Sequence, residues 1–341
     1  MRILMITPSF HPAVGGVETH VRRVSECLAA RGHEITVLTH SDEPGDAELG
    51  PLAVHRLPRA NWWRAWQASR PHIAAANIVH CHDAYSFLHF YLPSCYLGPR
   101  RPAFATFHGY ESYPIRSEAL RWRAFVRRRV RDALCMGEFI CRWYGTKCAA
   151  VSYGGVDPGE RPPLPQRSGA LFIGRLAEDT SIMFYLHALA LLKSDRGRTL
   201  PLTVLGDGPM RQPAEMYAKA QRLDTRFLGA VPNPDEYLAL ADMAFVSGYL
   251  SIWQALAARR LVFAVYENEL KRDYLTCFPE ADKVMMISAE AEELADQLLH
   301  YLDNRDMYDD KRDLGARLAA ENTWDRVADL YLSMYRARGC V

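Results

Sequence analysis

The chain has 341 residues, of which 49% are hydrophobic and 24% are charged. This composition is typical of globular proteins and excludes disordered and fibrous chains. The 41 Lys and Arg residues are balanced by 40 Asp and Glu residues, so the net charge is only +1. A general nucleic-acid binder would be far more basic, and the length predicts two domains of roughly 150 residues each.

The first forty residues predict a βαβ unit. Residues 2–7 form an apolar run of strand length, and residues 17–30 carry apolar side chains at helical spacing. Gly32 stands where a helix C-cap glycine belongs, before a second strand at 33–39. A βαβ unit requires a parallel sheet. Further strands of this sheet are expected at 53–56, 77–82, 103–108, 133–136 and 148–151.

The pattern is interrupted by a stretch rich in Gly and Pro at 154–165, which predicts a linker because proline cannot donate a backbone hydrogen bond. Beyond it, strands are expected at 170–174, 202–206, 225–228, 243–247 and 261–265. Helices are expected at 182–193, 214–222, 249–259, 290–303, 306–321 and 324–338. We therefore predict an α/β protein in which two Rossmann-like, doubly wound domains face a cleft. The predicted parts are domain 1–155, linker 156–168, domain 169–322, and a C-terminal helix within 323–341 that packs back toward the first domain.

Two glycine loops stand at predicted strand-to-helix turns. Gly15 and Gly16 precede the first helix, and the run Gly206-Asp207-Gly208 follows a strand of the second domain. Helix N-termini and free backbone amides bind anions, although glycine also serves tight turns for purely steric reasons. The first loop lacks GxGxxG spacing and the chain has no GxxxxGK[ST] motif, which argues against a dinucleotide enzyme and a P-loop enzyme.

Arg175 follows the first predicted strand of the second domain, at the carboxyl edge where open α/β sheets bind ligands. Its guanidinium can pair in two places with a diphosphate. The alternative is a surface arginine in a salt bridge.

Six short motifs then appear in order: VGGVE at 14–18, VHCHD at 79–83, TFHG at 106–109, VSYGGVD at 151–157, IGRL at 173–176 and GDGP at 206–209. Together with the closing TWDRV at 323–327, they resemble the GT-B glycosyltransferases of family four. That family includes bacterial phosphatidylinositol mannosyltransferases and many polysaccharide-assembly enzymes. The resemblance covers essentially the whole chain.

The resemblance implies a retaining, metal-independent glycosyltransferase of hexosyltransferase type. A nucleotide sugar would be held by the second domain, and a glycan, lipid-linked or small-molecule acceptor by the first. No cofactor is expected beyond this co-substrate. His108 and Arg175 would lie in the reaction zone, with the amides of Gly15 and Gly16 on the diphosphate. The other donor residues would be Gly206, Asp207, Gly208, Ser251 and Gln254, and the acceptor residues His82, Asp83 and Tyr110.

The chain departs from the family pattern at three positions. A lysine that usually follows the arginine by six residues is Ser181 here, and two glutamates spaced by eight are Val246 and Gln254. Lys271 or Arg272 is a candidate for the missing cation. Two alternatives therefore stay open: a non-catalytic subunit that recognises sugar or nucleotide, or stabilises a partner transferase, and, with less support, a sugar-nucleotide epimerase.

Thiols and imidazoles raise the question of a metal. Eight cysteines are scattered without a CxxC pair, so we expect reduced thiols. In the run 80–83, His80 and His82 share one face of a strand while Cys81 points away, so we expect cleft-lining side chains and no metal site.

No apolar run approaches the ~20 residues that span a bilayer, and the first residues are expected to form a strand rather than a signal peptide. We expect a cytoplasmic protein. Residues 117–134 predict a basic amphipathic helix, with a tryptophan-rich stretch at 61–66. Such elements contact the inner face of an anionic membrane, or simply pack on the sheet.

Overall fold

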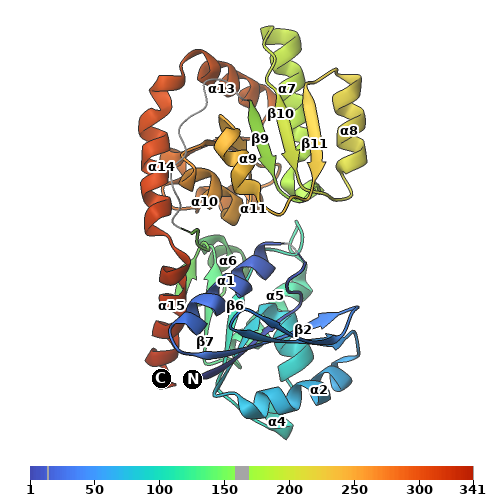
Figure 1. Ribbon diagram of the computed structural model, residues 1–341, viewed down its shortest axis with the longest axis vertical. Coiled ribbons are helices and arrows are strands. Elements are labelled where there is room, and N and C mark those ends of the chain that lie inside the picture. Colours follow the sequence, from blue (N-terminus) through green and yellow to red (C-terminus); the bar gives the residue numbers. More distant parts are fainter. Residues whose placement is uncertain (14, 158–168, 341) are drawn as a thin grey trace. The chain divides into compact units, whose positions relative to one another are not determined.

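The computed structural model describes residues 1–13, 15–157 and 169–340, so most of the predicted linker lies outside the described residues. The chain divides into two compact units. Unit 1 comprises Met1–Gly154 and Trp324–Val341, and unit 2 comprises Gly155–Thr323. Each is an α/β structure built on a largely parallel sheet (Figure 1).

Unit 1 contains an eight-stranded sheet in the order β3-β4-β2-β1-β5-β6-β7-β8. Its strands are β1 (Arg2–Thr7), β2 (Glu34–Ser41), β3 (Gly45–Leu49), β4 (Leu52–Pro58), β5 (Ile78–His82), β6 (Ala103–Phe107), β7 (Asp132–Met136) and β8 (Ala150–Ser152). All neighbours pair in parallel except β3 and β4. The central strands are buried along their length, which explains why they are continuous apolar runs in the sequence.

The helical segments of unit 1 are α1 (Gly16–Ala30), α2 (Trp62–Ala75), α3 (Asp83–Ser86), η1 (Phe87–Tyr91), α4 (Ser94–Leu97), α5 (Ser117–Arg127), α6 (Glu138–Tyr144) and α15 (Trp324–Ala337). The last of these packs against α1, which confirms the predicted return of the C-terminal helix to the first part of the chain. Arg31 binds Asp325 and Asp329 of α15, and Arg338 binds the buried Asp132 at 2.6 Å.

Unit 2 contains a six-stranded sheet in the order β11-β10-β9-β12-β13-β14, with every pair parallel. Its strands are β9 (Ala170–Ile173), β10 (Leu202–Leu205), β11 (Thr225–Gly229), β12 (Met243–Phe245), β13 (Leu261–Val265) and β14 (Met285–Ser288). Its helical segments are η2 (Glu178–Thr180), α7 (Ile182–Arg196), α8 (Arg211–Ala220), α9 (Pro234–Leu240), α10 (Tyr249–Ala257), α11 (Glu269–Thr276), α12 (Ala281–Val284), α13 (Ala291–Asp303), η3 (Arg305–Tyr308) and α14 (Asp309–Glu321). This arrangement confirms the predicted Rossmann-like fold class.

The glycine loop after β10 is shaped by close backbone packing. Gly206 and Gly208 both have positive φ, 137° and 154°. A Cβ at Gly206 would overlap the carbonyl oxygen of Gly174, and one at Gly208 would overlap that of Leu176. The amide of Gly206 donates to the carbonyl of Gly229, and the amide of Gly208 donates to the Asp207 carboxylate. Glycine is therefore required here by the contact between neighbouring sheet loops.

Candidate functional site

In unit 1, histidines gather at the carboxyl edge of the sheet. His82 is the last residue of β5 and His108 directly follows β6, which pairs with β5 in parallel. Their rings share a hydrogen bond of 3.0 Å between His82 Nδ1 and His108 Nε2. The buried face of α1 adds His20, whose ring centre lies 5.0 Å from that of His108. Two predicted site residues are thus brought into contact, and a third histidine joins them.

A buried chain of hydrogen bonds continues from these rings to α15. His80 shares one bond of 2.7 Å with the hydroxyl of Tyr335 and another of 2.8 Å with that of Thr106. Thr106 contacts the hydroxyl of Tyr331 at 2.8 Å, and Tyr331 in turn contacts His20 Nε2 at 2.8 Å. The C-terminal helix therefore supplies two hydroxyls that hold the histidine rings in position.

Burial keeps these imidazoles neutral. It lowers the pKa of His20 and of His80 to about 3, and it lowers the pKa values of His82 and His108 well below 6.5. Nε2 of His108 is engaged by His82, which leaves Nδ1 as the ring nitrogen that can meet a ligand. A neutral imidazole in this setting exchanges hydrogen bonds with a hydroxyl and does not act as a cationic acid.

The loop that carries His108 is fixed by Asp83 and Arg123. Asp83 has a positive φ of 65°, and its carboxylate accepts the backbone N–H of His108 at 2.8 Å. Burial raises the pKa of Asp83 to about 6. Arg123 lies buried on α5 and donates to the carbonyls of His108 and Gly109 and to the carboxylate of Glu111, at 2.9–3.1 Å. Arg123 therefore connects α5 to the backbone of the histidine loop.

Replacing Arg123 with Met is expected to lower the free energy of unfolding of unit 1 by about 2 kcal/mol, because two carbonyls and a carboxylate lose a charged donor. Arg121→Met is the matched control, since Arg121 is an exposed residue of the same helix. Chemical denaturation followed by tryptophan fluorescence measures the difference, as six of the seven tryptophans belong to unit 1. Equal stability of the two variants would contradict this role of Arg123.

The prediction of an amphipathic helix over 117–134 is wrong in two respects: the helix is shorter, and not all of its arginines lie on the exposed side. The helix ends at Arg127, and Leu134 belongs to β7. Arg123 lies inside the unit, with its guanidinium 3.9 Å from the centre of the Tyr144 ring, whereas Trp122 is 43% exposed. The charge pattern failed to predict this because a buried arginine whose guanidinium is held by oxygen partners looks like a surface arginine in the sequence.

The remaining predicted residues of unit 1 surround this edge. Tyr110 is half-buried and its ring lies 6.2 Å from that of Phe139. Gly15 is the N-cap of α1 with extended backbone, and Gly16 is the first helical residue. The carboxylate of Glu18 folds back against Gly15, so an acidic side chain already faces the helix N-terminus where an anion was predicted.

In unit 2, cations gather at the corresponding edge. Arg175 follows β9 and forms two hydrogen bonds with the carboxylate of Asp179, at 2.9 and 3.0 Å. Lys271 lies on α11, after β13, where it is buried and donates to the carbonyl of Ser247 at 2.8 Å. Burial lowers the pKa of Lys271 to about 8, while the negative charge of Asp179 opposes that shift. Asp179 thus interacts with two cations that come from different strand ends.

The structure separates the two candidates for the missing cation. Arg272, the neighbour of Lys271, is exposed and pairs with Asp273 at 3.2 Å. Only Lys271 of this pair points into the unit, with its ammonium 4.4 Å from the centre of the Tyr274 ring.

The other predicted donor residues lie on loops and helices of the same unit. Asp207 pairs with Arg211 at 2.9 Å, beside the glycine loop. Ser251 donates to the carbonyl of Gly248 at 3.0 Å. Gln254 on α10 donates to the carboxylate of Asp235 at 3.4 Å. Their contact with a nucleotide sugar stays a prediction.

Comparison with known proteins decides the family. The profile of Glycosyltransferase Family 4 matches residues 14–158, and that of Glycosyl transferases group 1 matches residues 167–304. The chain belongs to glycosyltransferase family 4. Glycosyltransferases of this family have the GT-B fold, which agrees with the two Rossmann-like sheets.

Individual relatives of this family 4 chain are distant. A subunit of the phosphatidylinositol N-acetylglucosaminyltransferase of Arabidopsis thaliana is 31% identical over 106 residues, which are 26% of this chain and only 23% of that protein. Glycogen synthase of Mycobacterium tuberculosis is 24% identical over 303 residues, 72% of this chain and 71% of that protein. The structure of HepE from Anabaena in complex with UDP superposes with a TM-score of 0.78 at 14% identity, covering 99% and 100% of the two chains, which shows a shared fold.

Where the family 4 pattern has its lysine, Ser181 adopts a left-handed conformation with φ 56° and hydrogen-bonds Glu267. Both residues line a hollow of about 140 Å³, together with Glu178. Burial raises the pKa of Glu267. The position of the family lysine is thus occupied by a neutral side chain in acidic surroundings, so the cations of this edge come from other positions, among them Arg175 and Lys271.

Several residues of the candidate site were not predicted. The buried network of unit 1 adds His20, Thr106, Tyr331 and Tyr335 to His80, which was expected to line the cleft. One signal was present in the sequence, because His20 shares its helical face with the apolar Val21, Val24 and Leu28. The others are joined by contacts between residues more than 200 positions apart, such as Thr106 and Tyr331.

Proposed function

We propose that this family 4 chain is a retaining, metal-independent glycosyltransferase. Unit 2 would bind a nucleoside diphosphate sugar, and unit 1 would bind a glycan, lipid-linked or small-molecule acceptor. The observation that carries the proposal is a pair of cations, Arg175 and Lys271, at the carboxyl edge of the unit 2 sheet. Both interact with the carboxylate of Asp179. A diphosphate would take the place of Asp179 on both cations and would be stabilised as the sugar bond breaks.

In unit 1, His108 would contribute hydrogen bonds to a sugar hydroxyl from its neutral imidazole. Two buried nitrogens of the same cluster, His20 Nδ1 and His82 Nε2, have no partner in the described part of the chain. Buried polar atoms without partners cost free energy, which a bound hydroxyl would recover. Asp83 and Tyr110 would complete the acceptor side.

The test is incubation of the full chain with nucleotide sugars, beginning with UDP-glucose because HepE of Anabaena was crystallised with it. We expect UDP and nucleotide sugars of the accepted base to raise the melting temperature of the protein. With an acceptor panel of glycans and lipid-linked sugars, we expect release of the nucleoside diphosphate. Absence of both binding and release across the panel would contradict the proposal.

A non-catalytic subunit is a second candidate function. The observation in its favour is the replacement of the family lysine and glutamates by Ser181, Val246 and Gln254, combined with the ion pair that already occupies Arg175. This candidate predicts nucleotide binding without release of a product. Co-purification with a second transferase would support it.

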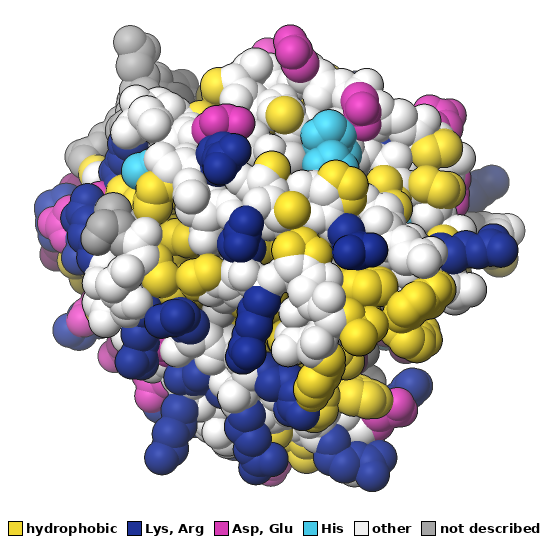
Figure 2. Space-filling model, turned by 90° about the horizontal axis from the view of Figure 1, so that it is seen from below, with side chains coloured by type: hydrophobic (Ala, Val, Ile, Leu, Met, Phe, Trp, Pro, Cys, Tyr) yellow, Lys and Arg dark blue, Asp and Glu magenta, His cyan; other side chains and the backbone are white. Residues whose placement is uncertain are grey.

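Contact with an anionic membrane is proposed at a surface of unit 1. Trp62, Tyr96 and Leu97 are 54%, 69% and 61% exposed, and a hollow of about 340 Å³ close to this region is lined by four arginines: Arg100, Arg101, Arg129 and Arg131. Figure 2 shows a face on which Lys and Arg side chains gather around exposed apolar ones. None of the helices in the described residues is long and apolar enough to cross a bilayer. Sedimentation with anionic vesicles tests the proposal, and no binding at low salt would end it.

A further inference from the structure

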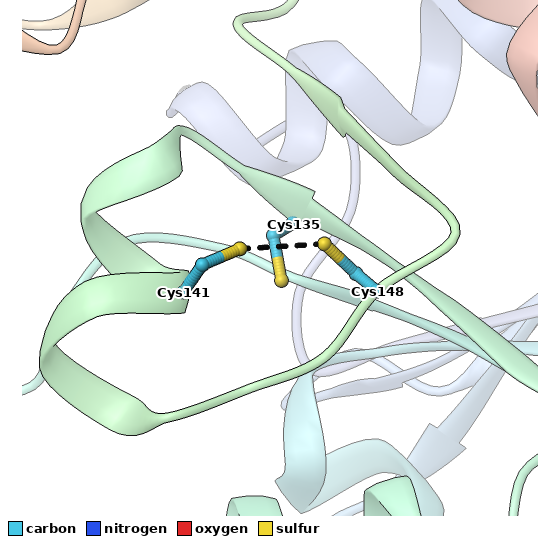
Figure 3. A group of neighbouring side chains, drawn as sticks. All are labelled: Cys135, Cys141 and Cys148. Atoms are coloured by element: carbon cyan, nitrogen blue, oxygen red, sulfur yellow. Dashed lines mark hydrogen bonds between the residues drawn. The ribbon is translucent and has the colours of Figure 1, made fainter.

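Three cysteines meet in unit 1, and none of them is among the residues assigned to sugar transfer. Cys135 lies in β7, Cys141 on α6, and Cys148 shortly before β8 (Figure 3). Their sulfur atoms all lie within 4.8 Å of one another, and those of Cys141 and Cys148 are 3.4 Å apart. The sequence spacing hides this cluster because consecutive members are six and seven positions apart, without a CxxC pair.

The crossover from β7 to β8 brings the three thiols together. Gly137, with φ 99°, turns the chain out of β7 into α6, and Gly145, with φ 60°, ends that helix and returns the chain toward β8. Cys135 is buried, whereas Cys141 and Cys148 are half-buried. The cluster is therefore closed on the sheet side and accessible from the other.

We propose that Cys135, Cys141 and Cys148 form a binding site for a thiophilic metal ion, with Zn²⁺ as the ion of first choice. Zinc binds thiolate sulfur at about 2.3 Å, which places two sulfurs of one tetrahedral site roughly 3.8 Å apart. The separation of 3.4 Å between Cys141 and Cys148 and the upper limit of 4.8 Å for all three pairs bracket that value, so side-chain rotations can complete the site. Each thiol that binds loses its proton to solvent, and an exogenous ligand such as water takes the fourth position.

The three sulfur donors determine which kind of ion the site selects. Soft thiolate ligands select Zn²⁺ and Cu⁺ over Mg²⁺ and Ca²⁺. No fourth His, Cys, Asp or Glu within the described ranges joins the three sulfurs, which is why the fourth position is assigned to an exogenous ligand.

The cluster also differs from a redox pair. A disulfide between Cys141 and Cys148 would use two thiols and leave Cys135 without a function, and it would require an oxidant. Within the residues that the structure describes, no cysteine takes part in a disulfide. Three converging thiols are the donor set of a metal site, although the sequence alone led us to expect no metal.

The experiment titrates the full, reduced, chelator-treated chain with Zn²⁺ in competition with a chromophoric chelator, and with Co²⁺ as a spectroscopic probe. We expect one equivalent to bind, with a sulfur-to-cobalt charge-transfer band in the near ultraviolet. Cys141→Ser and Cys148→Ser are each expected to weaken Zn²⁺ binding by about 100-fold and to reduce the intensity of the band. Cys95→Ser is the matched control, because Cys95 is a half-buried thiol of the same unit outside the cluster.

Thermal unfolding gives a second readout that does not depend on activity. Zn²⁺ is expected to raise the melting temperature of the native chain and of Cys95→Ser, but not that of Cys148→Ser. Absence of the charge-transfer band, or equal Zn²⁺ affinity in all four proteins, would overturn the proposal. So would mass spectrometry that finds Cys141 and Cys148 disulfide-bonded after purification, together with no Zn²⁺ uptake by the reduced chain.

Discussion

Lowering the pH from 7.5 to 5 is expected to reduce the free energy of unfolding of unit 1 by about 4 kcal/mol or more. In the unfolded chain a histidine takes up its proton near pH 6.5, whereas folded His20 and His80 stay neutral until about pH 3. Between these limits the unfolded state binds more protons, so stability falls as the pH falls. Each of the two histidines contributes about 2 kcal/mol over this interval.

The other groups of the cluster modify this total in known directions. The pKa values of His82 and His108 are also lowered by burial, so these residues add to the loss. The pKa of Asp83 is raised to about 6, so its protonation below that value stabilises the folded state and offsets about 1 kcal/mol. The net effect is destabilisation by acid.

Denaturant unfolding at the two pH values, followed by tryptophan fluorescence, measures this loss. In His20→Phe, the loss of unfolding free energy between pH 7.5 and pH 5 is expected to be about 2 kcal/mol smaller than in the native protein, whatever the effect of the substitution on stability at pH 7.5. His55→Phe is the control, because His55 lies near the surface beside Asp46. If His20→Phe loses as much unfolding free energy between pH 7.5 and pH 5 as the native protein does, burial of His20 is not the cause of the acid destabilisation.

Replacing Lys271 with Met is expected to weaken binding of a nucleoside diphosphate by about 100-fold, because a buried ammonium contributes a charge-assisted hydrogen bond that a thioether cannot replace. The neighbouring Arg272→Met is expected to leave the affinity unchanged, since Arg272 is exposed and paired with Asp273. Calorimetric titration with UDP measures both affinities.

The pH profile separates a direct role of Lys271 from a structural one. Because the pKa of Lys271 is lowered to about 8, the free protein loses this charge above pH 8, and the Kd for the nucleotide is expected to rise there. Lys271→Arg keeps its charge at pH 9 and is expected to show a flatter profile. A Kd of the native protein that stays constant from pH 7 to pH 9.5 would contradict the proposed contact.

Where sequence patterns predicted the fold, they did so through apolar periodicity. β1 and β13 have the predicted bounds, because both are buried along nearly all of their length and are uninterrupted apolar runs in the sequence. β3 was missed because its residues are mostly exposed, and its antiparallel pairing with β4 leaves no apolar pattern. β14 was missed because it is short and only partly buried.

For the candidate site, the sequence predicted which residues lie at the ends of individual strands, but not how their side chains contact one another. His82 and Arg175 were singled out because they lie at the ends of predicted strands, and parallel strands place such residues at one edge. His108 was assigned from the family resemblance, and the contact of all three with a ligand stays a prediction. Arg175 is exposed and pairs with Asp179, which is the alternative that the sequence left open for it. The burial of Lys271 depends on which side chains turn inward, which no spacing encodes. The cysteine cluster likewise depends on the path of one crossover.

The return of α15 to unit 1 makes unit 2 an insertion within the chain of unit 1. On the ribosome, unit 2 emerges as one continuous segment and can complete its fold while synthesis is still under way. Unit 1 has to wait for α15, because Tyr331 and Tyr335 supply hydroxyls to its buried histidines. A polypeptide that stalls before this helix would therefore carry one finished unit and one whose buried histidines lack the hydroxyls of α15.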